Sequence, residues 1–134
     1  MTNVVDIEGI GPDRAEKLAA AGVKTTDDLL KLGGSAKGRK DLEAATGLGQ
    51  ALILKWVNRA DLFRIKGVGT QYSDLLEAAG VDTVAELAQR RADNLTKKMA
   101  EVNEEKKVVR ALPAESMVSG WIEEAKGLPR AVEY

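Results

Sequence analysis

The chain has 134 residues, of which 44% are hydrophobic, so it is long enough for one compact domain or for two small ones that share a core. Lysine and arginine number 20, and aspartate and glutamate number 21. The resulting net charge of -1 provides no overall attraction to a polyanion, so any nucleic-acid site must be a local basic patch. The sequence contains no cysteine and no histidine, which excludes disulfides, thiolate zinc sites and the commonest general base.

The sequence also indicates where the protein works. No window approaches the roughly 18 consecutive apolar residues of a membrane span, and the N-terminus lacks the basic-then-apolar pattern of a signal peptide. We therefore expect a soluble, cytoplasmic protein that does not interact with a membrane.

The chain begins with short helical segments that are separated by glycines. Residues 3–7 predict one helical turn with Asn3 as its cap. Residues 9–11 (GIG), here called the early glycine turn, end it. Pro12 then marks the start of a helix over about residues 12–21, because proline fits the first turn of a helix.

The next segments continue this pattern. Thr25 and Asp28 have the spacing of a capping box that opens a second helix, after Gly22 in the left-handed conformation. Residues 35–40 are small, polar and basic, and we expect them to form an exposed loop. Helical spacing returns on both sides of residues 47–49 (GLG), the middle glycine turn.

The second half of the chain repeats the first at an offset of 58 residues. Between Ile7 and Leu29, ten of 23 positions are identical to their partners in the second half, so an internal duplication is the natural explanation. The early glycine turn is repeated at residues 67–69 (GVG), here called the late glycine turn. The matched residues are Ile7, Gly9, Gly11, Leu18, Ala20, Ala21, Gly22, Val23, Thr25 and Leu29.

After Leu87 the two copies diverge. Apolar spacing over residues 94–112 predicts either one helix or two, and Pro113 starts a last helix that is expected to pack back on the repeats. No segment shows the alternation of a strand. The expected fold is all-α, with a first unit over residues 1–60 that includes the middle glycine turn, a second over 61–112, and a C-terminal helix and tail over 113–134.

The glycine turns are the candidate functional elements. Two glycines around one apolar residue allow positive φ and close approach of the backbone to another molecule. The first N–H groups of the following helix point outward together, with the positive end of the helix dipole behind them, so such a turn can bind a phosphate. The central Ile10 or Val68 is expected to point inward and anchor the turn.

Residues 7–15 (IEGIGPDRA) and 65–69 (IKGVG) resemble the helix-hairpin-helix motif, which binds the DNA backbone without reading sequence in repair nucleases, ligases and Holliday-junction proteins. The whole chain is similar to a family of small bacterial proteins of unknown function that are built on tandem copies. The resemblance implies duplicated helix-hairpin-helix units of short, SAM-like helices. It also implies that backbone amides of both turns face phosphates, around Gly9, Ile10 and Gly11 and around Gly67, Val68 and Gly69.

The two turns differ in charge. After the turn, where DNA-binding members of that class often carry lysine or arginine, this chain has Asp13 and Gln71. An acid there repels a phosphate, whereas Arg64 and Lys66 precede the late turn and favour it. Other basic candidates that could support binding are Lys37, Arg39, Lys40, Lys55 and Arg59, with Arg90, Arg91, Lys97 and Lys98. Six phosphate contacts would give a log–log salt slope of about -5 on duplex DNA.

Three aromatic residues bear on the mode of binding. Trp56 and Trp121 lie on apolar helix faces and are expected in the core, and only Tyr72 follows a turn where it is expected to be exposed. One exposed ring is a poor platform for stacking single-stranded bases.

Two functions remain open from the sequence. The first is a non-enzymatic module that binds DNA backbone without sequence specificity, and the second is a protein-interaction or scaffolding domain that keeps the fold without DNA binding. The acidic pI of about 5.6 and Asp13 favour the second. No spacing singles out an acid–base pair, a metal cage, a cofactor or a small-molecule ligand. No sequence motif indicates a preferred DNA form, a protein partner or an oligomeric state.

Overall fold

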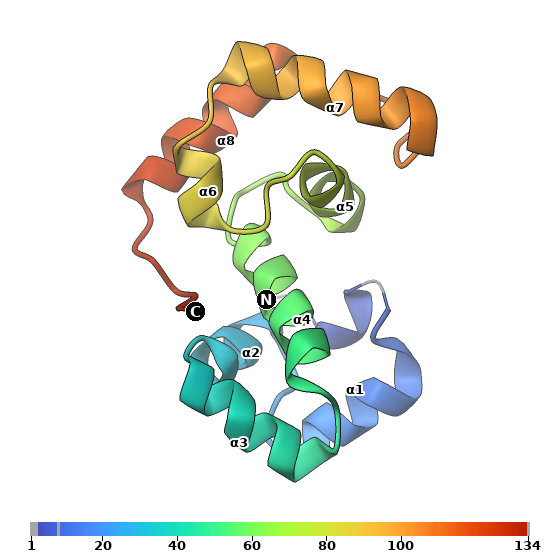
Figure 1. The fold of residues 1–134 in the computed structure, drawn as a ribbon, viewed down its shortest axis with the longest axis vertical. Coiled ribbons are helices and arrows are strands. Elements are labelled where there is room, and N and C mark those ends of the chain that lie inside the picture. Colours follow the sequence, from blue (N-terminus) through green and yellow to red (C-terminus); the bar gives the residue numbers. More distant parts are fainter. Residues whose placement is uncertain (1–2, 8, 134) are drawn as a thin grey trace. The chain divides into compact units, whose positions relative to one another are not determined.

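The computed structural model describes residues 3–7 and 9–133, which form one 3-10 helix and eight α-helices and no strand, so the all-α expectation is confirmed. These residues divide into two compact units, whose helices are labelled in Figure 1. Unit 1 contains the described residues up to Phe63 and those from Arg130 onward, and unit 2 is Arg64–Pro129. These limits differ from the expected ones at 60 and 112, because the last helix belongs to unit 2 and the segment after it to unit 1.

Unit 1 contains η1 (Val4–Asp6), α1 (Gly11–Ala20), α2 (Thr26–Gly33), α3 (Ala36–Thr46) and α4 (Gln50–Leu62). Unit 2 contains α5 (Thr70–Ala78), α6 (Val84–Ala88), α7 (Ala92–Lys106) and α8 (Glu115–Gly127).

The start of η1 and the end of α7 can be compared with what the sequence predicts. The turn expected over residues 3–7 is η1, but Asn3 makes no side-chain capping hydrogen bond. Of residues 94–112, expected as one helix or two, those up to Lys106 belong to the single helix α7, which ends where Lys107 adopts a positive φ of 50°. The helical prediction for residues 107–112 is wrong, because they form no helix. The Asn103 side chain then bonds both backbone groups of Val109, which turns the chain away from the helix.

The start of α2 is the capping box that the sequence predicts. Thr25 Oγ1 accepts the N–H of Asp28, and the Asp28 carboxylate accepts the N–H groups of Lys24 and Thr25. These N–H donors lower the pKa of Asp28, so the carboxylate stays ionised to more acidic pH than in an unfolded chain. The cap therefore contributes fully above the ordinary aspartate pKa and weakens only as the pH falls through the lowered value.

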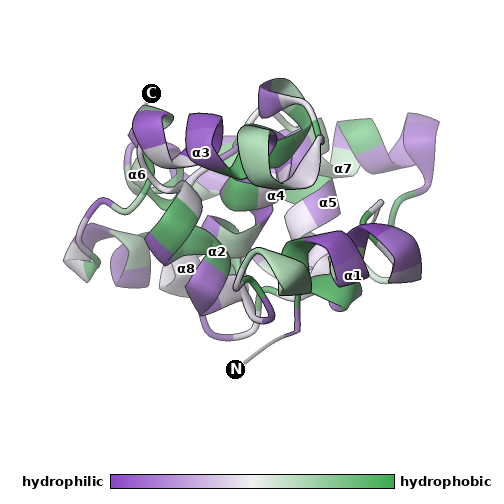
Figure 2. Cartoon of the chain, turned by 90° about the horizontal axis from the view of Figure 1, so that it is seen from below, coloured by the Kyte–Doolittle hydropathy of each residue, from purple (hydrophilic) through white to green (hydrophobic). Residues whose placement is uncertain are grey.

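The exposed loop predicted over residues 35–40 is wrong, because α3 begins at Ala36. Ser35 is the N-cap, and its hydroxyl accepts the N–H of Gly38 at 3.0 Å. The basic residues of this segment lie on a short helix whose few buried residues are Arg39 and Leu42. Figure 2 shows hydrophilic residues along much of α3 and α1, as expected for helices that expose most of their surface.

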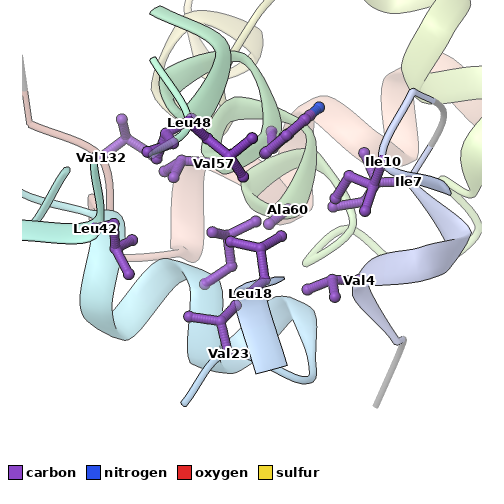
Figure 3. Close-up of a cluster of buried hydrophobic side chains, with 13 residues drawn as sticks. Val4, Ile7, Ile10, Leu18, Val23, Leu42, Leu48, Val57, Ala60 and Val132 are labelled. Carbon is purple, nitrogen blue, oxygen red and sulfur yellow. The ribbon is translucent and has the colours of Figure 1, made fainter. Parts of the chain in front are cut away.

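The core of unit 1 is a cluster of side chains from all five of its helical elements, and Figure 3 shows most of them pointing toward one another. Leu18 on α1, Leu29 on α2 and Val57 on α4 are fully buried there. Val132, from the segment that follows unit 2 in the sequence, is also part of this cluster. Unit 1 is therefore built from two separate stretches of chain.

Helices α4 and α8 show that the duplication extends further than the sequence comparison found. Each has 13 residues, and each has a buried tryptophan as its seventh, at an offset of 65 residues. Both helices bury residues at the same four positions, which are Ile53, Trp56, Val57 and Ala60 in α4 and Val118, Trp121, Ile122 and Ala125 in α8. Each unit therefore ends its repeat with an equivalent tryptophan helix.

Substitution by alanine is expected to have opposite effects on stability at two helical glycines, Gly38 and Gly120. A Cβ at Gly38 in α3 would overlap the backbone carbonyl oxygen of Leu32, whereas a Cβ at Gly120 in α8 meets no atom within 4 Å. We expect Gly38→Ala to destabilise the protein by about 1–3 kcal/mol through overpacking, despite the better helix propensity of alanine. Gly120→Ala is expected to stabilise it by about 0.5–1 kcal/mol. Urea denaturation followed by circular dichroism measures both, and two changes of the same sign would contradict the packing described for α3.

Candidate nucleic-acid interface

The late glycine turn leads directly into α5. Gly67 has a positive φ of 90°, and the side chain of Val68 between the glycines is buried, as predicted. Gly69 is the N-cap of α5 and, having no side chain, provides no capping hydrogen bond. Lys66, Gly67 and Gly69 are exposed. Solvent therefore reaches the backbone at the start of α5.

Three of the eight α-helices in the described part of the chain have a side-chain N-cap. The hydroxyls of Thr25, Ser35 and Thr83 each accept a backbone N–H in the first turn of α2, α3 and α6. Neither α5 nor α1, the two helices that follow the late and early glycine turns, has a side-chain cap. Helices α4, α7 and α8 also lack one, but α1, α7 and α8 have an acid in the first turn, and Glu43 accepts the first N–H of α4. No acid lies in the first turn of α5, so no carboxylate of that turn offsets the positive end of its helix dipole.

Trp121 on α8 supports the late turn from behind. A Cβ at Gly67 would lie 3.5 Å from the indole Nε1, so the turn and the tryptophan are in close contact. The Tyr72 ring lies 5.3 Å from the Trp121 ring, tilted by 51°. Tyr72 is therefore half-buried and packed on the tryptophan instead of standing free as expected, which removes it as a stacking platform for bases.

A carboxylate lies beside the late turn. The backbone N–H of Lys66 donates to both oxygens of Glu124 on α8, at 3.0 and 3.4 Å. Arg64, the other cation predicted here, is half-buried and donates from Nη2 to the carbonyl oxygen of Pro129 at 2.7 Å. Of these two predicted cations, only Lys66 is exposed to solvent.

The early glycine turn also has a buried apolar residue between its glycines and a tryptophan behind it, but its helix begins at the second glycine, Gly11, whereas α5 begins after Gly69. Gly9 and Gly11 have positive φ values of 92° and 66°, and Ile10 is buried between them, as predicted. Trp56 on α4 lies behind the turn, with Nε1 3.9 Å from the position of a Cβ at Gly9. Arg14 matches Tyr72 in position and covers the Trp56 ring with its guanidinium, 5.7 Å from the ring centroid.

The charges of the early turn favour a phosphate less. Arg14 also donates to the carbonyl oxygen of Gly9 at 2.7 Å, so its guanidinium is engaged with the turn itself. Asp13 is exposed in the first turn of α1, where it repels an approaching phosphate. Glu8 lies outside the described residues.

The supporting basic residues separate into two groups. Lys37, Lys40 and Lys55 are exposed on α3 and α4 of unit 1, and Arg59 is half-buried on α4. Arg39 is a wrong prediction as a phosphate contact, because it is buried and donates to three backbone carbonyl oxygens. These belong to Gly33, Gly34 and Glu133. Its guanidinium cannot leave without removing a donor from each of these three oxygens.

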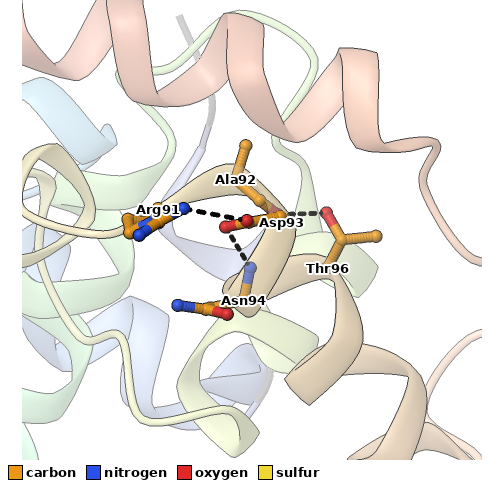
Figure 4. A network of polar contacts seen from close by, with 5 residues as sticks. All are labelled: Arg91, Ala92, Asp93, Asn94 and Thr96. Atoms are coloured by element: carbon orange, nitrogen blue, oxygen red, sulfur yellow. Dashed lines mark hydrogen bonds and ion pairs between the residues drawn. The ribbon is translucent and has the colours of Figure 1, made fainter.

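A hollow of about 410 Å³ lies in unit 2 between the start of α7 and α8, but its charges balance. Arg90, Arg91 and Lys126 are matched by Asp93, Glu115 and Glu123 in its lining. Figure 4 shows the Asp93 carboxylate accepting the Asn94 N–H at 2.7 Å and pairing with Arg91 at 3.1 Å, and these contacts lower the pKa of Asp93. The hollow therefore offers no net charge to a phosphate.

The described residues offer neither a metal site nor a helix that could span a membrane. The described side chains contain no group of three or more acidic residues that could hold a metal ion. None of the helices within residues 3–7 and 9–133 is long and apolar enough to cross a membrane.

These features define a small all-α protein of two similar helical units, each with a glycine turn that lies in front of a buried tryptophan. The chain belongs to the family described as Domain of unknown function (DUF4332), whose model matches residues 8–128. Comparisons with curated proteins and with solved structures found no match. The family's description assigns no activity, which agrees with the expected similarity to a family of unknown function.

Proposed function

We propose that the protein is a non-enzymatic module that binds the nucleic-acid backbone, DNA in the first place, without reading its sequence. The glycine turns act as helix-hairpin-helix elements in this proposal, and the late turn is the principal contact. A phosphate would lie against the backbone amides around Gly67 and Gly69, with Lys66 beside it.

The observation that carries the proposal is the exposed, uncapped start of α5. The other α-helix starts have either a Ser or Thr cap, as in α2, α3 and α6, or a carboxylate in the first turn or on the first N–H, as in α1, α4, α7 and α8, whereas α5 has neither a side-chain cap nor an acid in its first turn. At α5 the cap residue is Gly69, which allows the backbone to approach another molecule closely. Amides at a helix start together with the helix dipole are a common phosphate site.

The early turn has an assisting role in the proposal. Its backbone differs at the second glycine, since Gly11 has a positive φ of 66° and Gly69 a φ of -103°, and Asp13 opposes a phosphate while Arg14 is engaged with Gly9 and Trp56. Exposed Lys37, Lys40 and Lys55 of unit 1 could add contacts to other phosphates. Such contacts are independent of sequence because phosphates are the same at every base pair.

A titration of a labelled duplex by fluorescence anisotropy tests this function. We expect binding at about 50 mM salt that weakens steeply by about 200 mM, with a log–log slope of about -5 if six phosphates are contacted. The combined variant Gly67→Val and Lys66→Glu is expected to bind at least about tenfold more weakly, since it loses the close approach and reverses a charge. Absence of wild-type binding at low salt would refute the function.

A matched control separates the turn from net charge. Lys106→Glu with Gly120→Val makes the same two kinds of change on α7 and α8, at an exposed lysine and at a glycine with open space around it. This control is expected to retain most of the affinity. Equal losses in both double variants would mean that the late turn is not the contact, and circular dichroism establishes that both remain helical.

A protein-interaction domain is the second candidate, and specific observations favour it. The carboxylate of Glu124 lies beside the late turn and Asp13 beside the early one, so both turns carry an acid. Leu112 and Met117 expose 46% and 41% of their surface in unit 2, as residues at a protein contact would. Capture from a lysate with and without nuclease distinguishes the two candidates, because a protein partner remains after nuclease treatment.

A further inference from the structure

The contact between Lys66 and Glu124 places an anion of the chain itself at the late turn. The Lys66 N–H donates to both carboxylate oxygens, and the bond is exposed to solvent. A phosphate oxygen would be an equivalent acceptor for this amide, since both are anionic oxygens that take N–H donors. The Glu124 carboxylate therefore stands where a bound phosphate would find its nearest backbone donor.

The position of Glu124 is fixed by the tryptophan one turn before it. Trp121 and Glu124 are three residues apart on α8, so they lie on the same side of the helix. Trp121 contacts Gly67 from behind, and Glu124 reaches the residue before Gly67. One face of α8 thus supplies both the support of the turn and the carboxylate beside it.

The matched position in unit 1 shows that this architecture does not require a carboxylate. Arg59 follows Trp56 by three residues, as Glu124 follows Trp121, so arginine occupies the place of Glu124 in the first repeat. Unit 1 nevertheless forms its glycine turn with Trp56 behind it. A carboxylate three residues after the tryptophan is therefore specific to the second repeat.

We infer that Glu124 is an autoinhibitory residue, whose carboxylate competes with a phosphate for the backbone amide of Lys66, directly before the late glycine turn. This inference rests on the proposed function and adds to it a regulation of the same site. Binding at the late turn requires the Glu124 side chain to leave Lys66, which an exposed hydrogen bond allows at small cost. Loss of the negative charge exposes the site.

The test compares Glu124→Gln with Glu123→Gln. Both variants remove one negative charge from α8, but Glu123 pairs with Lys126 on the exposed surface and does not contact Lys66. We expect E124Q to bind a labelled duplex about fivefold more tightly than E123Q at low salt, because only E124Q removes the competing anion. Glu124→Ala, which removes the acceptor altogether, is expected to bind at least as tightly as E124Q.

A second readout uses inorganic phosphate and no DNA. The backbone amide of Lys66, followed by NMR, is expected to shift on addition of phosphate at about fivefold lower concentration in E124Q than in the wild type or in E123Q. Circular dichroism checks that the variants are equally helical.

Each outcome decides between the two proposals. Equal behaviour of E124Q and E123Q in both measurements overturns the role of Glu124, and the proposed function stands if the wild type binds the duplex. A duplex that no variant binds, together with a Lys66 amide that responds to phosphate only in E124Q, overturns the function and supports the role of Glu124. No response to either probe in any variant overturns both.

Discussion

Replacement of Trp56 by alanine is expected to lower the free energy of unfolding of unit 1 by about 3–5 kcal/mol. The side chain is only 1% exposed and belongs to the cluster that joins η1, α1, α2 and α4. It also contacts the early turn at Gly9 and carries the guanidinium of Arg14 over its ring. Its removal leaves a cavity that borders the core and the turn at once.

Urea denaturation followed by circular dichroism measures this loss, with Trp56→Phe as the control. Phenylalanine retains an aromatic ring and leaves a smaller cavity, so we expect it to lose clearly less stability than alanine. In W56A, Trp121 is the one tryptophan left in the sequence, and its fluorescence reports unit 2. A W56A protein within about 1 kcal/mol of the wild type would mean that Trp56 does not support unit 1 as described.

The second large effect is expected for Arg39→Met, with a loss of about 2–3 kcal/mol. Methionine fills much of the same space but provides no donors for the carbonyl oxygens of Gly33, Gly34 and Glu133. Buried acceptors without a donor are costly, and the segment from Arg130 loses one of its attachments to unit 1. The Glu133 N–H, which donates to Gly34, should then exchange its hydrogen faster.

Lys40→Met is the matched control for this prediction. Lys40 is the next residue on α3, is exposed, and loses the same charge. We expect K40M to change stability by less than about 0.5 kcal/mol and to leave the exchange of the Glu133 amide as it is. Similar losses in R39M and K40M would attribute the effect to charge and not to the three carbonyl contacts.

The start of α2 and the glycine turns were predictable because their determinants are local. Thr25 and Asp28 bond within four residues, and Gly22 occupies a conformation that other residues rarely adopt. The burial of Ile10 and Val68 follows from the turn in the same way.

The segment at residues 35–40 was mispredicted for a non-local reason. Its small and basic residues look like a solvated loop, yet Arg39 is buried because acceptors converge on it from α2 and from Glu133, 94 residues away. No pattern within a short window reveals a partner at that separation. The capping position of Ser35 was the one local signal for a helix.

The equivalence of α4 and α8 was missed because the offset between the copies changes from 58 to 65 residues. Only the buried face is kept, as Trp-Val-x-x-Ala at Trp56 and Trp-Ile-x-x-Ala at Trp121, and this short pattern could have revealed it. The glycines of the candidate site and the exposed Lys66 beside them could be predicted from the sequence. The contact of Glu124 was not, because it depends on how α8 packs behind the late turn.

Because unit 1 is built from two separate stretches of chain, its core can be completed only late in synthesis. Val132 completes the unit 1 core, yet a ribosome reaches it only after synthesising all of Arg64–Pro129. Unit 2 is one continuous stretch of chain, whereas the unit 1 core includes a residue that is synthesised after all of unit 2. The first repeat therefore cannot complete its core until the last residues of this sequence have been made.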